Sequence, residues 1–240
     1  MKYVLDTHTH SLASGHSYST IREMAHSAAE KGLELLGITE HAPKMPGTCH
    51  DFYFYNLKVV QRNMCGVELL LGAELNILDF HGTVDLPEDI LKYMDVTVAS
   101  MHPPCIKAGT REQNTAAYLA VMKNPYVNII GHPDDGRFPV DFEALVKASK
   151  EYGVLLELNN GSLTANGPRA DSKLQDIEML RLCRQYNVPI VIGSDAHVDT
   201  DVGRHDLAEA LLVEVDFPEE LVINRSVQEL KKYVNRYKNL

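Results

Sequence analysis

The chain has 240 residues, 45% hydrophobic and 23% charged, which fits one soluble globular domain with a sizeable core. Its formal net charge of −10 argues against a broad nucleic-acid-binding surface, because such a surface needs clustered lysine and arginine. No CxxC pair, signal-peptide pattern or run of about eighteen apolar residues occurs, so we expect a cytoplasmic protein with no nucleic-acid or membrane partner.

Strand-like and helix-like segments alternate along the whole chain. Apolar runs typical of β-strands lie at residues 3–6, 35–39, 69–73, 96–100, 127–131, 154–158 and 189–193. Amphipathic patterns between them predict helices at residues 20–31, 114–123, 141–152 and 173–186. The remaining chain predicts an apolar helix from residue 206, a short strand at residues 221–223 and a basic helix that ends at Lys238. This alternation predicts a parallel α/β sheet with right-handed crossovers, in a single domain over residues 1–240.

Imidazole and carboxylate side chains fall at or soon after the ends of these strands. They are His8, His10, His16, His41, Glu74, His102, His132, Asp195 and His197. They follow the first five strands and the seventh, and only a closed or nearly closed barrel brings all of these strand ends to one place. In α/β barrels this rim is where active sites are built. The pattern therefore predicts an enzyme organised around several metal ions.

The placement of the histidines carries this prediction, because a single His-x-His pair is weak evidence. With eleven histidines in the chain, roughly half of one such pair is expected by chance. Seven of the eleven lie near predicted strand ends, whereas His26, His50, His81 and His205 lie in predicted helices or loops. For His26 and His205 we expect solvated helix positions, and His50 and His81 could lie near the rim. Clustering of this kind indicates a metal or catalytic site.

The ligand types restrict the metals. Imidazole with carboxylate suits zinc, iron and manganese, whereas oxygen-only cages suit magnesium and calcium. Seven imidazoles and two carboxylates exceed the coordination of one ion, so two or three ions are required. Glu74 is the natural bridge, because one carboxylate can give an oxygen to each of two ions. Asp6 and Glu40, each near a ligand histidine, are either outer carboxylates that orient imidazoles or solvated acids at strand ends.

The motifs around these residues resemble those of the PHP (polymerase and histidinol phosphatase) domain superfamily of metallophosphoesterases. In chain order they are DTHTH at residues 6–10, SGH at 14–16, ITEH at 38–41, GAE at 72–74, SMH at 100–102, GHP at 131–133 and GSDAH at 193–197. The stretch VDFPE at residues 215–219 is similar to the standalone bacterial phosphatases of the YcdX type. The resemblance implies a distorted (β/α)7 TIM-like barrel, a PHP-type metallophosphoesterase domain, with a trinuclear site. Glu40 departs from the family pattern, where aspartate is frequent.

The resemblance also implies how the ligands divide among three divalent ions. His8, His10, Glu74 and Asp195 would hold one ion, His102 and His132 would hold a second with Glu74, and His16, His41 and His197 would hold the third. Zinc is the first expectation, with manganese and iron as alternatives. Glu74 and Asp195 are also expected to be catalytic.

This site predicts a phosphatase that hydrolyses a phosphomonoester of a small molecule. Three divalent ions and two carboxylates give a formal charge of about +4, which complements a phosphate monoester dianion. A water bridging two ions would be acidified and could attack phosphorus in line, while the metals neutralise charge on the phosphoryl oxygens. No serine or cysteine nucleophile motif appears, which favours direct hydrolysis.

Three alternative functions stay open. A binuclear amidohydrolase-type hydrolase also begins with His-x-His and ends with Asp, but Lys92 and Lys107 only flank the position of its bridging lysine. That alternative would also leave His16, His41 and His197 unexplained. A PHP-type nuclease is disfavoured by the acidic chain, and a metal-storage or metal-sensing protein would keep the ligands without turnover.

The loops that follow the strands would recognise the substrate. Candidate residues there are Lys107, Arg111, Asn160 and Arg169, each of which could equally be a solvated loop residue. The sequence leaves open the identity of the substrate, the general acid and whether the chain forms a homo-oligomer.

Overall fold

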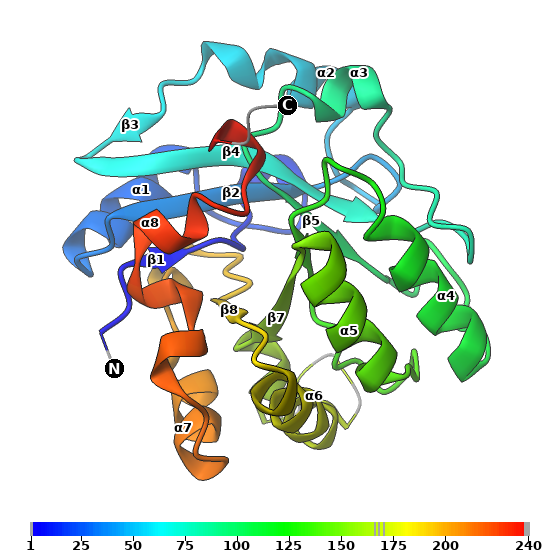
Figure 1. Cartoon of the computed structure of the whole chain (residues 1–240). Helices are drawn as coiled ribbons and strands as arrows, with labels where there is room; N and C mark the ends of the chain where they lie inside the picture. Colours follow the sequence, from blue (N-terminus) through cyan, green and yellow to red (C-terminus); the bar gives the residue numbers. More distant parts are fainter. Residues whose placement is uncertain (1, 166, 168, 170, 238–240) are drawn as a thin grey trace.

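Seven parallel strands form a nearly closed barrel, with helices packed around its outside (Figure 1). The computed structural model describes residues 2–165, 167, 169 and 171–237. In sheet order the strands are β1 (Leu5–Asp6), β2 (Leu35–His41), β4 (Val67–Asn76), β5 (Thr97–Ser100), β6 (Ile129–Ile130), β7 (Leu155–Asn159) and β8 (Ile190–Gly193). These are the seven predicted strands in their predicted order, so the (β/α)7 barrel is confirmed. A further short strand that was not predicted, β3 (Asn63–Met64), pairs antiparallel with β4.

The helices also follow the predicted pattern. They are α1 (Ile21–Glu30), α2 (Asp51–Asn56), α3 (Glu88–Leu91), α4 (Arg111–Val121), α5 (Phe142–Tyr152), α6 (Ser172–Tyr186), α7 (Asp206–Glu214) and α8 (Val227–Leu230). The four long predicted helices correspond to α1, α4, α5 and α6, and the predicted apolar helix to α7. The predicted basic C-terminal helix is wrong, because that stretch divides into α8 and a 3-10 turn at Asn235–Tyr237. Its expected end at Lys238 lies outside the described residues.

Local sequence explains where the crossover helices begin. The side chain of Thr20 accepts a hydrogen bond from the backbone N–H of Glu23, and the side chain of Glu23 bonds back to Thr20. Thr110 and Gln113 form the same reciprocal pair at the start of α4. Such capping boxes satisfy backbone donors that have no partner inside the first turn.

At the carboxyl ends of the strands, the barrel closes where the segments after β1 and β8 meet. The backbone N–H of Asp195 donates to the carbonyl of His8 at 2.9 Å, and that of His10 donates to the carbonyl of Ala196 at 2.8 Å. The two ends of the predicted ligand set, which are far apart in sequence, are therefore hydrogen-bonded neighbours.

Within the strands themselves, the side chain of Asn224 joins β1 to β8. Its Nδ2 donates to the carbonyls of Leu5 at 3.1 Å and Ile192 at 2.8 Å, and its Oδ1 accepts from the N–H of Ile192 at 2.7 Å. The strand predicted at residues 221–223 is wrong, because Val222 forms a single parallel bridge, to Ile190, and 3-10 turns lie on either side of it.

The barrel interior is apolar, and it is closed at the amino ends of the strands, opposite the rim. One buried cluster takes a residue from each of the seven strands, among them Leu5, Leu70 and Ile129. Ile223 and Leu230, from the C-terminal segment coloured orange to red in Figure 1, belong to the same cluster. A second cluster packs the helices against the outer face of the strands. The rim at the carboxyl ends of the strands is left for the polar side chains.

The described residues hold one sheet, and the assignment of the full range 1–240 to a single domain stays a prediction. Among the described helices, none has both the length and the apolar character needed to cross a membrane.

Candidate metal centre

Glu74, near the end of β4, lies at the centre of the predicted ligands. Its side chain is fully buried, with 0% exposed. Its carboxylate oxygens face five imidazoles, at 3.5 Å from His8 Nε2, 3.7 Å from His10 Nε2, 2.6 Å from His41 Nδ1, 3.2 Å from His102 Nε2 and 2.9 Å from His132 Nε2. One carboxylate thus touches ligands that come from β1, β2, β5 and β6, as a bridging ligand must.

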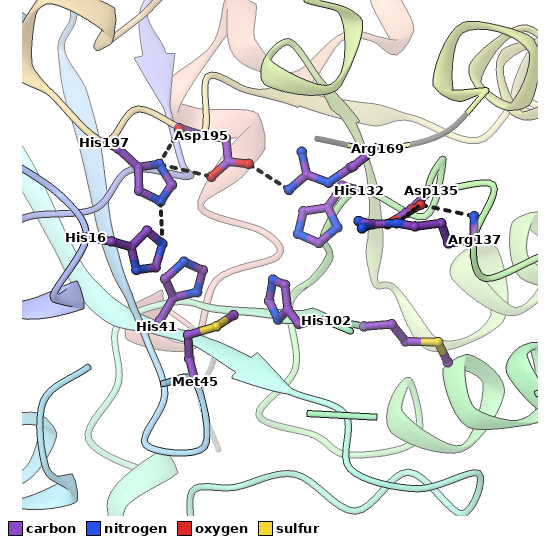
Figure 2. Close-up of a pocket in the computed structure, with 11 residues that line it drawn as sticks. His16, His41, Met45, His102, His132, Asp135, Arg137, Arg169, Asp195 and His197 are labelled. Carbon is purple, nitrogen blue, oxygen red and sulfur yellow. Dashed lines mark hydrogen bonds and ion pairs between the residues drawn. The ribbon is translucent and has the colours of Figure 1, made fainter. Parts of the chain in front are cut away.

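Asp195, just after β8, completes this group from the opposite edge of the sheet. Its Oδ1 lies 3.2 Å from Nε2 of His10 and 3.6 Å from Nε2 of His8. Its Oδ2 faces away from them and accepts a hydrogen bond from Arg169 at 2.8 Å. Figure 2 shows Asp195 between Arg169 and His197. The carboxylate therefore links the imidazole cluster to a cation in the pocket wall.

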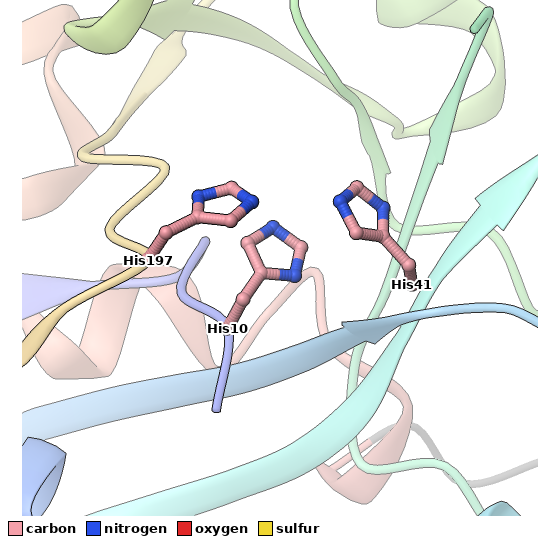
Figure 3. Close-up of side chains that lie close together, drawn as sticks. All are labelled: His10, His41 and His197. Carbon is pink, nitrogen blue, oxygen red and sulfur yellow. The ribbon is translucent and has the colours of Figure 1, made fainter. Parts of the chain in front are cut away.

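The outer part of the cluster consists of imidazoles alone. The ring nitrogens of His10, His41 and His197 lie within 4.8 Å of one another (Figure 3). Nε2 of His16 lies 3.2 Å from Nε2 of His197, so His16 belongs to the same region. Two further groups satisfy the same spacing, His8 with His10 and Glu74, and His41 with Glu74 and His102. All nine predicted ligands thus gather on one rim, while their division into three sets stays a prediction.

Buried ligand atoms without partners fit the binding of metal ions. Six such atoms have no hydrogen-bond partner within the described residues: Nε2 of His8, His10 and His102, Nδ1 of His41 and His132, and Oε2 of Glu74. Nδ1 of His41 lies 2.6 Å from Oε2 of Glu74 but is not aligned for a hydrogen bond, so neither atom satisfies the other. Each unsatisfied buried group costs about 1–3 kcal/mol. A divalent cation would satisfy these lone pairs.

Most of the protonation states also suit metal binding. His8 is the exception, because burial alone would lower its pKa but the carboxylates of Glu157, Glu74 and Asp195 hold that pKa well above its usual value. Burial holds the pKa of His10 well below its usual value. Burial and the charge of Arg169 lower the pKa of His132 to about 4. Burial alone would raise the pKa of Asp195, but His8 and Arg169 hold that pKa well below its usual value. Neutral imidazole and ionised carboxylate are the forms that coordinate metals.

Glu40 is a buried outer carboxylate. It accepts hydrogen bonds from Ser14 Oγ at 2.6 Å and from the backbone N–H of Ser11 at 3.0 Å. Ser14 Oγ in turn lies 3.2 Å from Nδ1 of His10. Because its side chain is fully buried, the solvated alternative does not hold, and Glu40 orients His10 through Ser14.

Asp6 is buried in the same way below the rim. It accepts hydrogen bonds from the backbone N–H groups of His8 at 3.3 Å, Ser194 at 3.2 Å and Gly203 at 2.8 Å. Since these residues belong to three different segments, Asp6 ties the loops after β1 and β8 together. The carboxylate acts on the backbone of the ligand loops, and the imidazole that it faces is that of His205, 3.9 Å from its Oδ2, and not one of the predicted ligands.

The histidines outside the predicted set have different environments. The side chain of His26 is 65% exposed on α1, as expected. The expectation for His205 is wrong, because this residue is only 5% exposed and packs edge-on against the ring of Tyr3. It immediately precedes α7, and its contact with Tyr3 places it beside the residues that lead into β1. His50 and His81 are exposed, and neither lines the cavity above the cluster.

Glu157, on β7, is a buried carboxylate that the sequence pattern did not indicate. No ligand was predicted on this strand, yet Oε1 of Glu157 lies 2.7 Å from Nδ1 of His8. The available signal was a single acid inside the otherwise apolar run VLLEL at residues 154–158.

A cavity of about 290 Å³ lies above the cluster. Figure 2 shows His16, His41 and Met45 on one side of it and Arg169 and Arg137 on the other. The cavity therefore combines the imidazole cluster with two cationic side chains.

Of the predicted substrate-recognition residues, only Arg169 lines this cavity. Lys107 is exposed, and Arg111 lines a separate pocket, where its Nε donates to the carbonyl of Val140. Asn160 is buried, and its Oδ1 accepts hydrogen bonds from backbone N–H groups at the start of α7. Arg137 was not predicted, because nothing in its local sequence separates it from a solvated turn residue.

Comparison with known proteins agrees with this geometry. A family model described as the PHP domain matches residues 6–161. A probable phosphatase of Clostridium novyi is 48% identical over 234 residues, covering 98% of this chain and 95% of that protein. A probable phosphatase of Acetivibrio thermocellus is 46% identical over 239 residues, covering 99% and 98%.

A solved structure is also similar. It is the histidinol phosphate phosphatase of Lactococcus lactis, complexed with zinc, L-histidinol and phosphate. The TM-score is 0.62 at 18% identity, and the match covers 90% of this chain and 95% of that one. At this identity the similarity shows the barrel fold.

Proposed function

The chain belongs to the PHP domain family and is a metal-dependent phosphatase, and we propose that it hydrolyses small phosphomonoesters at a three-metal site. The observation that carries the proposal is Glu74, a buried carboxylate that faces five imidazoles. Four of the nitrogens that face it, in His8, His10, His41 and His102, lack hydrogen-bond partners within the described residues, and Nε2 of His132 bonds to Glu74 itself. The zinc and phosphate bound by the similar structure from Lactococcus lactis support this class of reaction.

The three ions would be held as the motifs imply. His8, His10, Glu74 and Asp195 would hold the first, Glu74, His102 and His132 the second, and His16, His41 and His197 the third. Zinc is the expected ion, with manganese and iron as alternatives. When bound, the ions would acidify the attacking water and neutralise charge on the phosphoryl oxygens.

Arg169 would bind the phosphoryl group. Its guanidinium is held by Ser162 Oγ at 3.0 Å, Asn159 Oδ1 at 3.3 Å and Asp195 Oδ2 at 2.8 Å. These contacts fix its direction at the cavity wall, and planar guanidinium groups suit phosphate oxygens. Burial opposes the charge, but Asp195 and Asp134 raise the pKa of Arg169, so it stays a cation.

The leaving group would lie toward the outer part of the cavity. Arg137 is there, with 43% of its side chain exposed, and its Nη2 donates to Asp135 at 2.6 Å. Met45 supplies apolar surface at the same cavity. A small molecule with both polar and apolar parts fits this lining.

The amidohydrolase alternative finds no support in the position of its lysine. Lys107 is exposed, and Lys92 lies over the ring of Tyr93. Among the residues that line the cavity in the described part of the chain, none is lysine.

The test is turnover by metal-free protein reconstituted with zinc, manganese or iron. We expect hydrolysis of a generic aryl phosphate, followed by selective hydrolysis within a panel of phosphorylated metabolites. Full metal occupancy without any phosphomonoester hydrolysis would instead indicate metal storage or sensing. Faster hydrolysis of an oligonucleotide than of every monoester would indicate the nuclease alternative.

A further inference from the structure

Glu157 contacts more of the predicted ligand network than any motif implies. Its Oε1 lies 2.7 Å from Nδ1 of His8. Its Oε2 accepts hydrogen bonds from the backbone N–H of His132 at 2.8 Å and from Nδ2 of Asn159 at 3.0 Å. Asn159 Nδ2 also lies 3.4 Å from Oδ2 of Asp195. One buried carboxylate therefore touches, directly or through one amide, ligands from three strands.

The barrel leaves space for this carboxylate by using glycine at the end of the neighbouring strand β8. A Cβ added at Gly193 would lie 1.9 Å from Oε1 of Glu157, which no side chain could tolerate. The carboxylate therefore occupies the space that a side chain at position 193 would need.

The contact with His8 fixes which nitrogen faces the metals. A carboxylate only accepts hydrogen bonds, so Nδ1 of His8 carries the proton. In the neutral, metal-binding form of His8, Nε2 would then present its lone pair toward Glu74 and Asp195, which lie 3.5 Å and 3.6 Å away. Outer carboxylates that orient a ligand imidazole in this way typically contribute about 10–100-fold to metal affinity.

We propose that Glu157 is a positioning residue that organises the ligands of two ion positions at once and so couples their loading. The proposal rests on the three-metal site proposed above. His8 and Asp195 belong to the first ion position and His132 to the second, so both depend on the same carboxylate. Within the described residues, the hydrogen bonds of Glu157 go to His8, His132 and Asn159, so the third position, which has none of these residues, should be independent of it.

The experiment measures zinc binding by the full chain in competition with a chromophoric chelator, for the wild type and for Glu157→Gln. The amide keeps the shape of the side chain but replaces one acceptor oxygen by a donor, so it cannot satisfy both His8 and His132. We expect two of the three binding steps to weaken by about 10–100-fold and the third to be unchanged. Saturating zinc should restore most of the phosphatase rate.

Asp95→Asn is the matched control, because Asp95 is also a buried carboxylate but lies just before β5, away from the rim, where its Oδ2 accepts hydrogen bonds from Nε of Arg62 and the backbone N–H of Leu71, both at 2.9 Å. It should leave all three steps unchanged. If Glu157→Gln does not fold, Glu157→Asp provides the second variant, since the shorter side chain keeps the charge but cannot reach both partners. The same selective loss of two steps is expected.

Wild-type protein that binds fewer than three zinc ions would contradict the three-metal site itself. Three ions in the wild type, with all three steps unchanged in both Glu157 variants, would overturn the positioning role alone. Equal weakening of all three steps, together with a lower unfolding temperature of the metal-free protein, would show a general structural role and also overturn the proposal.

Discussion

Replacing Glu74 by glutamine tests the centre of the site with almost no change in side-chain volume. The carboxylate divides its two oxygens, with Oε1 facing His8, His102 and His132 and Oε2 facing His10 and His41. The amide keeps one oxygen and loses the charge, so it cannot serve both groups of imidazoles. We expect turnover to fall on the order of a thousandfold, which corresponds to about 4 kcal/mol of transition-state stabilisation.

The assay is steady-state hydrolysis of an aryl phosphate with elemental analysis of the same sample. Glu143→Gln, at a half-exposed glutamate on α5, makes the same substitution away from the cluster and should keep the wild-type rate. Near-normal turnover by fully metallated Glu74→Gln protein would refute the bridging role.

Five further variants test three separate parts of the structure. The alanine variants of His16, His41 and His197 should each release one ion and lose most of the activity while the fold persists. Unchanged metal content in all three variants would favour the binuclear amidohydrolase alternative. Arg169→Met should raise KM and weaken inhibition by inorganic phosphate by roughly tenfold to a hundredfold, as expected for loss of about 1.5–3 kcal/mol from charge-assisted hydrogen bonds. Asn224→Ala removes three buried hydrogen bonds at the β1–β8 junction and should lower the free energy of unfolding by about 3 kcal/mol in urea denaturation, with an unchanged midpoint counting against its role in closure.

The barrel and the ligand set could be predicted from the sequence because both depend on local patterns. Strands buried on both faces read as continuous apolar runs, and most of the ligands stand at or soon after the end of such a run. His102 and His132, for example, each follow their strand by two residues. Because parallel strands bring such positions to one rim, the clustering of the ligands could be predicted without knowing any long-range contact.

The features that were not predicted depend on partners far away in sequence. Glu157 pairs with His8 across 149 residues, and an isolated acid in a strand does not show whether it faces a histidine or solvent. Residues 221–223 have the composition of a strand, but Asn224 uses side-chain hydrogen bonds where ladder bonds would form. His205 has the local sequence of a helix start, while it is buried against Tyr3, beside the residues that lead into β1.

The central claim is that phosphatase activity requires several ions held by one cluster. Titration of metal-free protein with zinc, followed by elemental analysis and phosphomonoester hydrolysis at each step, tests it most directly. The account predicts two to three tightly bound ions per chain. Activity should appear only when more than one ion is bound. One ion or fewer after reconstitution with zinc, iron or manganese, or full activity at one ion, would contradict it.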